Sequence, residues 1–367
     1  MGTMRARRSH RARIARHAAV STSLALLSDR SLRALVAAAP VLGAGIGGTS
    51  AMLDVDGTPV FVKRVPLCEL EVLPENIRST ANVFRLPTFY QYGVGSAGFG
   101  AWRELAAHTM TTNWVLAGQG AAFPLMYHWR VLAGPPRPPA AADRADIDRL
   151  VEYWDGSPAV RGRLEAIATA AASLVLFLEY VPQTLNNWLA AQSARGGAAV
   201  GSACAMVLRR LLSDVEFMNS QGLVHFDAHF GNILTDGRRL YFADFGLATS
   251  AAFELSARER VFLDENAGHD ACHSVTQLVN WVATCVGGRD GRDEFIRRCA
   301  DPTDTAADFG RAAPAVAAIK PFAPVAVVIN AFYRKLYLEC RTTAYPAAAA
   351  RRAWAAAIRA SGAAGQE

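Results

Sequence analysis

The sequence predicts an α+β protein with two lobes, a small β-rich N-lobe followed by a larger helical C-lobe. Strand-like runs at residues 51–55 and 60–65 flank the turn signal Asp56-Gly57, which predicts a hairpin. A continuous apolar run at residues 173–178 has the pattern of a buried strand. Beyond it, apolar residues recur mainly at helical spacing. The chain has 367 residues, about half of them apolar, which is enough for two domains.

Residues 1–19 are expected to form a flexible basic tail, because the first 16 residues contain six arginines and no acid. Residues 20–180 form the predicted N-lobe. Its further elements are a helical lead-in at 20–40, an irregular stretch at 66–100, a helix at 101–108, a strand at 123–132, a loop at 133–139 and a helical insertion at 143–172.

Residues 181–367 form the predicted C-lobe. Apolar residues at helical spacing predict a buried helix at 202–221 that ends near Gly222. Two short apolar runs around Asp236-Gly237 predict a hairpin. The remaining segments expected to be packed helices are 274–285, 324–340 and 347–360.

The charge distribution argues against a nucleic-acid partner. The formal charge is +6, but without the six N-terminal arginines 32 bases face 32 acids, whereas a nucleic-acid reader needs a basic patch on its folded body. No uninterrupted run reaches the roughly 18 apolar residues of a membrane span. Six cysteines without a C-x-x-C pair indicate a reduced, cytoplasmic protein. His269, Cys272 and His273 could ligate a metal from one helix face, but no fourth ligand is spaced nearby.

A glycine-rich loop contains Gly43, Gly45 and Gly48 in the pattern G-x-G-x-x-G. Strand-like residues follow the loop where a dinucleotide site would open a helix, and Thr49 stands where a Walker loop has lysine. Lys63 lies on a strand 15 residues past the last glycine of the pattern. Glycines let backbone N–H groups approach phosphates, and the lysine adds a compact charge, although Lys63 could also be a solvated strand residue.

A lysine in this role needs an acid partner on a nearby helix. Glu104, in the helix expected at 101–108, is the first choice. Glu69 and Glu71 are the alternatives, and an exposed helix glutamate is the plainer interpretation of Glu104.

Three residues in the second half of the chain are spaced so that their side chains could converge on one bound triphosphate. Asp227 suits a base that orients a hydroxyl, while Asn232, five residues later, and Asp244, twelve beyond that, offer oxygen ligands to Mg²⁺. Taken singly, each residue is as compatible with an ordinary polar turn or strand end.

These residues together resemble the protein-kinase-like superfamily over residues 40–285. The resemblance rests on the glycine loop, Lys63, the 177–181 run Phe-Leu-Glu-Tyr-Val, His225-x-Asp227, Asn232 and the Asp244-Phe245-Gly246 motif. It implies a two-lobed kinase-like fold that binds ATP and Mg²⁺. Leu178 then resembles the gatekeeper, and the backbone of Glu179 and Val181 resembles the hinge that binds adenine. The Arg- and Ala-rich composition also resembles actinobacterial proteins of the kinase family.

Two departures bear on the substrate. Phe226 stands where protein kinases usually have arginine, and His229 stands where they have lysine, which is similar to aminoglycoside and choline phosphotransferases. An A-P-E motif is missing between Asp244 and Ser274, and Asp270 is expected to brace the 225–232 loop. Without arginine beside Asp227, no switch by a phosphorylated activation loop is expected.

We therefore expect an ATP-dependent transferase that passes the γ-phosphate to a hydroxyl, with Asp227, Lys63 and His229 as catalytic residues. A serine/threonine protein kinase is the first hypothesis. A small-molecule phosphotransferase is the second, and a nucleotide-binding pseudokinase is the third. The partner is a protein or small-molecule hydroxyl acceptor. If His229 lies near the γ-phosphate, activity should respond to pH between about 6 and 7.5.

Overall fold

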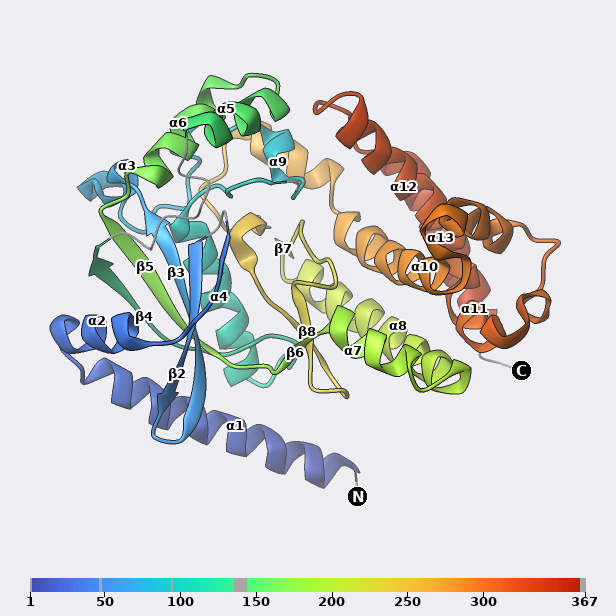
Figure 1. The fold of residues 1–367 in the computed structure, drawn as a ribbon, viewed down its shortest axis with the longest axis horizontal. Coiled ribbons are helices and arrows are strands. Elements are labelled where there is room, and N and C mark those ends of the chain that lie inside the picture. The colour runs from blue at the N-terminus through green and yellow to red at the C-terminus, as the bar shows by residue number, and fades with distance from the viewer. Residues whose placement is uncertain (1, 46–47, 94, 135–143, 364–367) are drawn as a thin grey trace. The chain divides into compact units, whose positions relative to one another are not determined.

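The computed structural model describes residues 2–45, 48–93, 95–134 and 144–363 (Figure 1). The chain is α+β and divides into two compact units. The first unit comprises the chain up to Val181 with Asp244–Ala248 and Phe253–Ser256. The second comprises Pro182–Ala243, Thr249–Ala252 and the chain from Ala257 onward.

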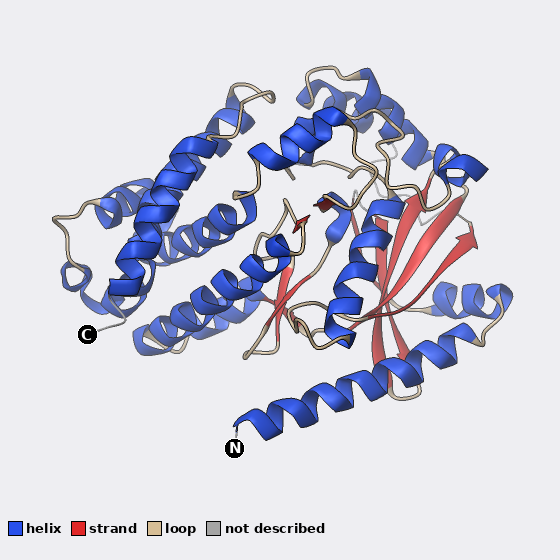
Figure 2. Cartoon of the chain, turned by 180° about the vertical axis from the view of Figure 1, so that it is seen from behind, coloured by secondary structure: helices blue, strands red, loops and turns tan. Residues whose placement is uncertain are grey.

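A five-stranded antiparallel sheet forms the centre of the first unit (Figure 2). Its order is β1 (Val41–Gly45), β2 (Gly48–Val55), β3 (Thr58–Leu67), β5 (Ala172–Glu179) and β4 (Met126–Ala133). Asp56 and Gly57 join β2 to β3 with φ of 52° and 77°. Two left-handed residues suit a tight turn whose twist matches that of the strands, so the hairpin predicted from Asp56-Gly57 is confirmed.

Helix α4 (Ala101–Leu116) packs on one face of this sheet. Leu174, Leu176 and Leu178 of β5 share a buried cluster with the start of α4, whereas Val175 and Phe177 point the other way and are also buried. Helix α2 (Asp29–Ala38) contacts both β2 and β4. The sheet is buried on both faces along β5, which explains the continuous apolar run.

The N-terminal segment differs from the flexible tail expected for residues 1–19. Helix α1 (Gly2–Ala25) contacts β4, and Arg13 is only 7% exposed. The Arg13 Nε donates to both carboxylate oxygens of Glu179 at 2.9 and 2.8 Å, and its other nitrogens donate to the carbonyls of Ala121 and Phe123. The expectation failed because the acid that pairs with Arg13 lies 166 residues away in the sequence.

The 66–100 stretch and the insertion form one layer within the first unit. The stretch contains α3 (Glu69–Val72), η1 (Pro74–Asn76) and η2 (Thr88–Gln91), and the insertion contains α5 (Arg144–Tyr153) and α6 (Pro158–Ala168). Asp155 and Gly156, both with positive φ, separate the two helices where one helical element was expected. The two segments share a buried cluster formed by Leu86, Tyr90, Phe99, Ile147, Val151, Trp154, Val160 and Leu164. Most of the loop expected at 133–139 lies outside the described residues.

The second unit is mainly helical. Its helices are α7 (Leu185–Ser193), α8 (Gly197–Ser220), α9 (Ala257–Glu265), α10 (His269–Ala300), α11 (Ala313–Ile319), α12 (Ala323–Leu338) and α13 (Ala347–Ala363), with η5 (Ala306–Ala312) and η6 (Lys320–Phe322). Its short strands are β6 (Gln183–Thr184), β7 (Leu223–Val224), β8 (Ile233–Thr235), β9 (Leu240–Phe242) and β10 (Thr249–Ser250). Helix α8 buries Cys204, Val207, Leu211, Val215 and Met218 at the predicted helical spacing.

One stretch in the described part of the chain, Ala306–Leu338, is long and apolar enough to cross a membrane by length and composition alone. Its most apolar window is 44% buried inside the second unit. The stretch comprises η5, α11, η6 and α12, and Gly310 interrupts η5 with φ of 55°. Within the second unit, α11 packs against α8, and α12 packs against α10 and α13.

Candidate functional site

Lys63 lies at the centre of a charged group in the first unit. It pairs in register with Ser50 and Leu176, and its side chain lies on the α4 face of β3. The Nζ atom donates to Glu104 Oε1 at 2.6 Å and to Asp244 Oδ1 at 2.7 Å. The side chain of Glu104 is 3% exposed, that of Lys63 is 12% exposed, and that of Asp244 is 49% exposed.

Glu104 is thus the partner that the sequence favoured for Lys63. Of the two alternatives, Glu69 is exposed, and Glu71 accepts instead from Arg163 Nη1 at 2.9 Å. Glu71 Oε1 also accepts from the N–H of Ala101 at 2.7 Å. The Glu71 carboxylate thus provides a hydrogen-bond acceptor for the first backbone N–H of α4, which has no acceptor within the helix.

Burial and charge act in opposite directions on this group. Burial alone would lower the pKa of Lys63, but the Asp244 and Glu104 carboxylates outweigh it and raise that pKa above its ordinary value. Burial raises the pKa of Glu104, and the adjacent Lys63 opposes that rise. Lys63 is therefore a fixed positive charge at neutral pH.

Asp244 has a left-handed backbone, with φ of 63° and ψ of 74°. Such a conformation is uncommon for residues other than glycine and needs support from its surroundings. Phe245, the next residue, is buried and packs edge-on against His108 of α4 with ring centroids 4.9 Å apart.

Gly43 and Gly45 lie on β1 and Gly48 begins β2, which pairs with β1, while the expected loop residues Ile46 and Gly47 lie outside the described residues. Gly48 has φ of 126°, and a Cβ there would overlap the Arg64 carbonyl of β3, so this glycine is required by the close approach of two strands. Gly43 pairs with Ser50, and no described atom lies within 4 Å of a Cβ placed at Gly45. Open backbone at Gly45 is compatible with a bound phosphate.

The residues that resemble a gatekeeper and hinge lie at the end of β5. Leu178 belongs to the buried cluster beneath α4. The N–H of Glu179 donates to the Leu125 carbonyl at 2.7 Å, and its carboxylate accepts from Arg13 and from the Leu125 N–H. Val181 is the last residue of this segment in the first unit.

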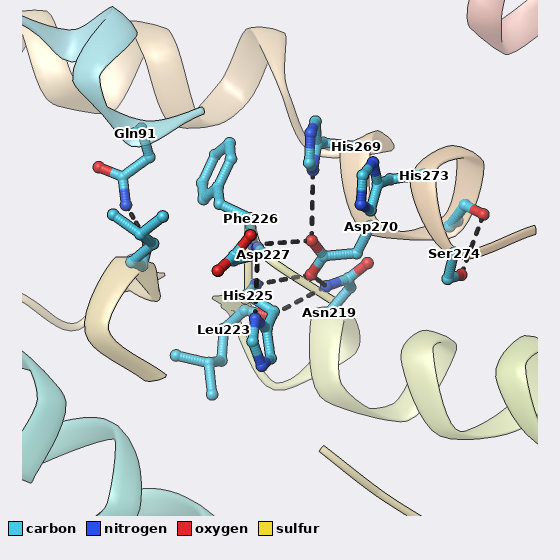
Figure 3. Close-up of polar contacts among 12 residues, drawn as sticks. Gln91, Asn219, Leu223, His225, Phe226, Asp227, His269, Asp270, His273 and Ser274 are labelled. Carbon is cyan, nitrogen blue, oxygen red and sulfur yellow. Dashed lines mark hydrogen bonds and ion pairs between the residues drawn. The ribbon is translucent and has the colours of Figure 1, made fainter. Parts of the chain in front are cut away.

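In the second unit, Asp270 organises the loop that contains Asp227 (Figure 3). This fully buried carboxylate accepts from the N–H of His225 at 2.6 Å, the N–H of Phe226 at 2.9 Å and Asn219 Nδ2 at 3.1 Å. Burial would raise the pKa of Asp270, but the hydrogen bond and charge of His269, followed by the charge and backbone N–H of His225, lower that pKa to about 2. The prediction that Asp270 braces this loop is confirmed.

Asp227, His229 and Asn232 lie together in this loop. Asn232 Nδ2 donates to the Asp227 carboxylate at 2.8 Å and to its carbonyl at 3.1 Å. His229 Nε2 is 3.9 Å from Asp227 Oδ2, and His229 Nδ1 accepts from the Gly231 N–H at 2.9 Å. Because Nδ1 is an acceptor, the neutral imidazole has its proton on Nε2, which points it toward Asp227.

Phe226 is buried among other ring side chains. Its backbone is left-handed with φ of 62°, and its buried ring stacks on Phe262 at 5.6 Å and lies 5.0 Å from His269. His269 in turn bonds to the Tyr333 hydroxyl at 2.8 Å and stacks on His273. In the described part of the chain, no group of three His, Cys, Asp or Glu side chains is arranged to hold a metal, which disfavours the His269-Cys272-His273 alternative.

Sequence reasoning missed the residues that contact the chain after Asp244. Gln91 donates to the Leu247 carbonyl, and Thr80 exchanges hydrogen bonds with Glu254. Both lie in the irregular 66–100 stretch, where no periodic pattern or motif distinguishes a polar contact residue from a loop residue.

No protein-family model matches this chain, and a search of curated proteins also finds no match.

Proposed function

We propose that this chain is an ATP-dependent phosphotransferase of protein-kinase-like fold, with a serine/threonine protein kinase as the first candidate. The observation that carries the proposal is the buried cation Lys63 held between Glu104 and Asp244. The α+β fold supports the proposal, since it combines a five-stranded antiparallel sheet that has α4 on one face with a mainly helical second unit.

The geometry of Lys63 suits a phosphate. An ammonium group has three N–H donors, and two are directed at Glu104 and Asp244. The third would bond to a phosphate oxygen, and the two carboxylates would keep Nζ in place before the nucleotide arrives. Such preorganisation is how phosphotransferases stabilise charge on the transferred group.

Asn232 and Asp244 each carry an oxygen donor of the kind that Mg²⁺ prefers. Both Asn232 Nδ2 bonds go to Asp227, so the amide oxygen is the atom that would bind Mg²⁺. Asp244 offers a half-exposed carboxylate. Hard oxygen donors of this kind suit Mg²⁺, which would neutralise phosphate charge when bound.

Asp227 would orient and deprotonate the acceptor hydroxyl. Its carboxylate is 23% exposed and is held by the Asn232 amide, so its position is fixed while part of it remains accessible. Adenine would bind the backbone of Glu179 and Val181. Because the Glu179 N–H is already donated to Leu125, the contact from Glu179 would be made by its carbonyl.

His229 favours a second candidate, a small-molecule phosphotransferase. Its imidazole is 45% exposed and directs Nε2 toward Asp227, where the sequence pattern is similar to aminoglycoside and choline phosphotransferases. A histidine there would supply a hydrogen bond or a charge that depends on pH.

Phosphotransfer from labelled Mg·ATP tests the proposal. The purified protein is incubated alone, with a generic protein acceptor and with aminoglycosides, beside Asp227→Asn. Label on protein that disappears in Asp227→Asn supports the kinase, and label on a small acceptor alone supports the second candidate. Nucleotide binding without transfer to any acceptor contradicts the role of Asp227 and leaves a nucleotide-binding scaffold.

A further inference from the structure

The 66–100 stretch contacts residues of Asp244–Ala248 and Phe253–Ser256, and all of these segments belong to the first unit. We call residues 79–93 and 95–99 the brace; Val94 lies outside the described residues. The brace touches the chain after Asp244 at two places, one at the Asp244–Leu247 turn and one at Glu254.

The first contact is at the turn itself. Gln91, only 3% exposed, donates its side-chain amide to the Leu247 carbonyl (Figure 3). Gly98 has φ of 72° and lies so close to Gly246 that a Cβ on residue 98 would overlap the Gly246 carbonyl oxygen. Two consecutive peptide groups after Asp244 are thus fixed by the brace, one by a buried hydrogen bond and one by close packing.

The second contact joins the brace to both Glu254 and α4. The Thr80 N–H donates to Glu254 Oε2 at 3.1 Å, and Thr80 Oγ1 accepts from the Glu254 N–H at 2.9 Å. Arg103, adjacent to Glu104 on α4 and 1% exposed, donates Nε to the Thr80 carbonyl at 2.7 Å. The Arg103 guanidinium lies 5.1 Å from the Phe99 ring and 6.0 Å from the Phe253 ring.

These contacts surround a residue that needs support. The left-handed backbone of Asp244 persists only where neighbouring groups determine it, and the brace contacts Gly246 and Leu247 immediately after it. The Glu254 carboxylate accepts hydrogen bonds from the Thr80 N–H and the Ser79 hydroxyl, both of which belong to the brace. The segment is therefore held by groups present in the unmodified chain.

We propose that the brace sets the Asp244 turn in its metal-binding geometry without covalent modification of residues 244–256, with Gln91 as the positioning residue. The inference rests on the proposed function, since the task of Asp244 there is to bind Mg²⁺. It also gives the 66–100 stretch a role in the site.

Replacing Gln91 with the isosteric Met removes the amide donor and leaves the Leu247 carbonyl without it. Asn76→Leu is the matched control, because Asn76 Nδ2 also donates to a leucine carbonyl, that of Leu70 at 2.8 Å, but lies outside the brace. Both are made in the full chain. Binding of a non-hydrolysable ATP analogue is measured against Mg²⁺ concentration, ADP binding is measured in EDTA, and amide exchange is followed at residues 245–248.

Gln91→Met should require about 10-fold more Mg²⁺ for half-maximal analogue binding, as expected for loss of one buried hydrogen bond. Its ADP binding in EDTA should match that of wild type, and its amides at 245–248 should exchange faster. Asn76→Leu should leave both the Mg²⁺ requirement and the amide exchange at 245–248 unchanged. A Mg²⁺ requirement equal to that of Asn76→Leu overturns the positioning role. If Gln91→Met does not fold, Thr80→Val removes the hydroxyl that accepts from the Glu254 N–H and serves for the same measurements.

The remaining outcomes separate this inference from the proposed function. If the wild-type protein binds no nucleotide, the proposed function fails, and with it the metal-positioning role. Amide exchange at residues 245–248 then tests whether the brace holds the Asp244 turn. If these amides exchange at the same rate in Gln91→Met and wild type, the brace does not hold the turn. Phosphatase treatment should leave Mg²⁺-dependent analogue binding unchanged, and a loss of binding after dephosphorylation contradicts the proposal.

Discussion

Replacing Lys63 with methionine perturbs the charge on which the candidate site depends. Glu104, 3% exposed, would lose the cation 2.6 Å from its carboxylate and remain as a buried charge. Breaking a buried ion pair from one side destabilises a protein by about 3–5 kcal/mol. Asp244 is half exposed, so loss of its bond to Lys63 should add no more than about 1 kcal/mol.

Glu104→Gln removes the charge but keeps an oxygen that accepts from Lys63, so its expected cost is about 1–2 kcal/mol. In the double variant no buried charge is left at the pair. Its loss of stability should therefore be smaller than the sum of the single losses by at least about 1 kcal/mol, as in a double-mutant cycle of residues in contact.

The Lys63→Met variant should also change the pH dependence. Burial raises the pKa of Glu104 above its ordinary value of 4.5, and Lys63 opposes that rise. Without the lysine, the folded-state pKa lies further above the unfolded value, so the folded state takes up a proton more readily. The variant should be most stable relative to wild type below pH 4.5 and should lose stability as pH rises through the folded-state pKa.

Urea unfolding followed by tryptophan fluorescence measures these quantities, since the chain has 7 tryptophans. The measurements are made at about pH 5 and about pH 7.5 for wild type, both single variants and the double variant, because a raised pKa of Glu104 makes the stability of Lys63→Met fall as pH rises. The buried pair would be refuted if the losses of unfolding free energy in the two single variants added up in the double variant. It would also be refuted if Lys63→Met lost no more than the roughly 0.5 kcal/mol typical of a surface substitution.

Asp270→Ala leaves two buried N–H groups, those of His225 and Phe226, without an acceptor, so urea unfolding should report a loss of about 2–6 kcal/mol; a loss below about 1 kcal/mol contradicts the bracing role. Arg13→Met leaves the Glu179 carboxylate without its cation and should cost about 3 kcal/mol, whereas a flexible N-terminal segment predicts no change. Burial first, and then the neighbouring His269, lower the pKa of His273 to about 3, so the folded state resists its protonation and wild type loses stability as pH falls below 6.5. In His273→Phe the loss of unfolding free energy between pH 7 and pH 5 should be smaller by about 2 kcal/mol, and an equal loss in both proteins would show that His273 is not the sensitive group.

The sequence predicted elements whose cause is local. Asp56-Gly57 predicts a tight turn because both positions tolerate left-handed backbone, and α8 was predicted because its buried residues recur at helical spacing. Glu104 was chosen as the partner of Lys63 because it lies on the helix after the strands. Asp270 was chosen because it begins the helix after the 225–232 loop.

The sequence did not predict contacts between residues that lie far apart in the chain. Arg13 was assigned to a flexible tail because no acid lies near it in the sequence, and its partner Glu179 is at the end of β5. Gln91 was overlooked because a buried amide in an irregular segment has no sequence signature. Glu71 was considered for Lys63, but its pairing with Arg163 depends on how the insertion folds back onto α3.

A crystal structure of the full chain with Mg²⁺ and a non-hydrolysable ATP analogue would show directly whether these residues bind the nucleotide. We expect phosphate oxygens bonded to Lys63 Nζ, Mg²⁺ bound by the Asn232 amide oxygen and the Asp244 carboxylate, and adenine against the backbone of Glu179 and Val181. A nucleotide bound elsewhere, or a Mg²⁺ ion that contacts neither Asn232 nor Asp244, would contradict this expectation.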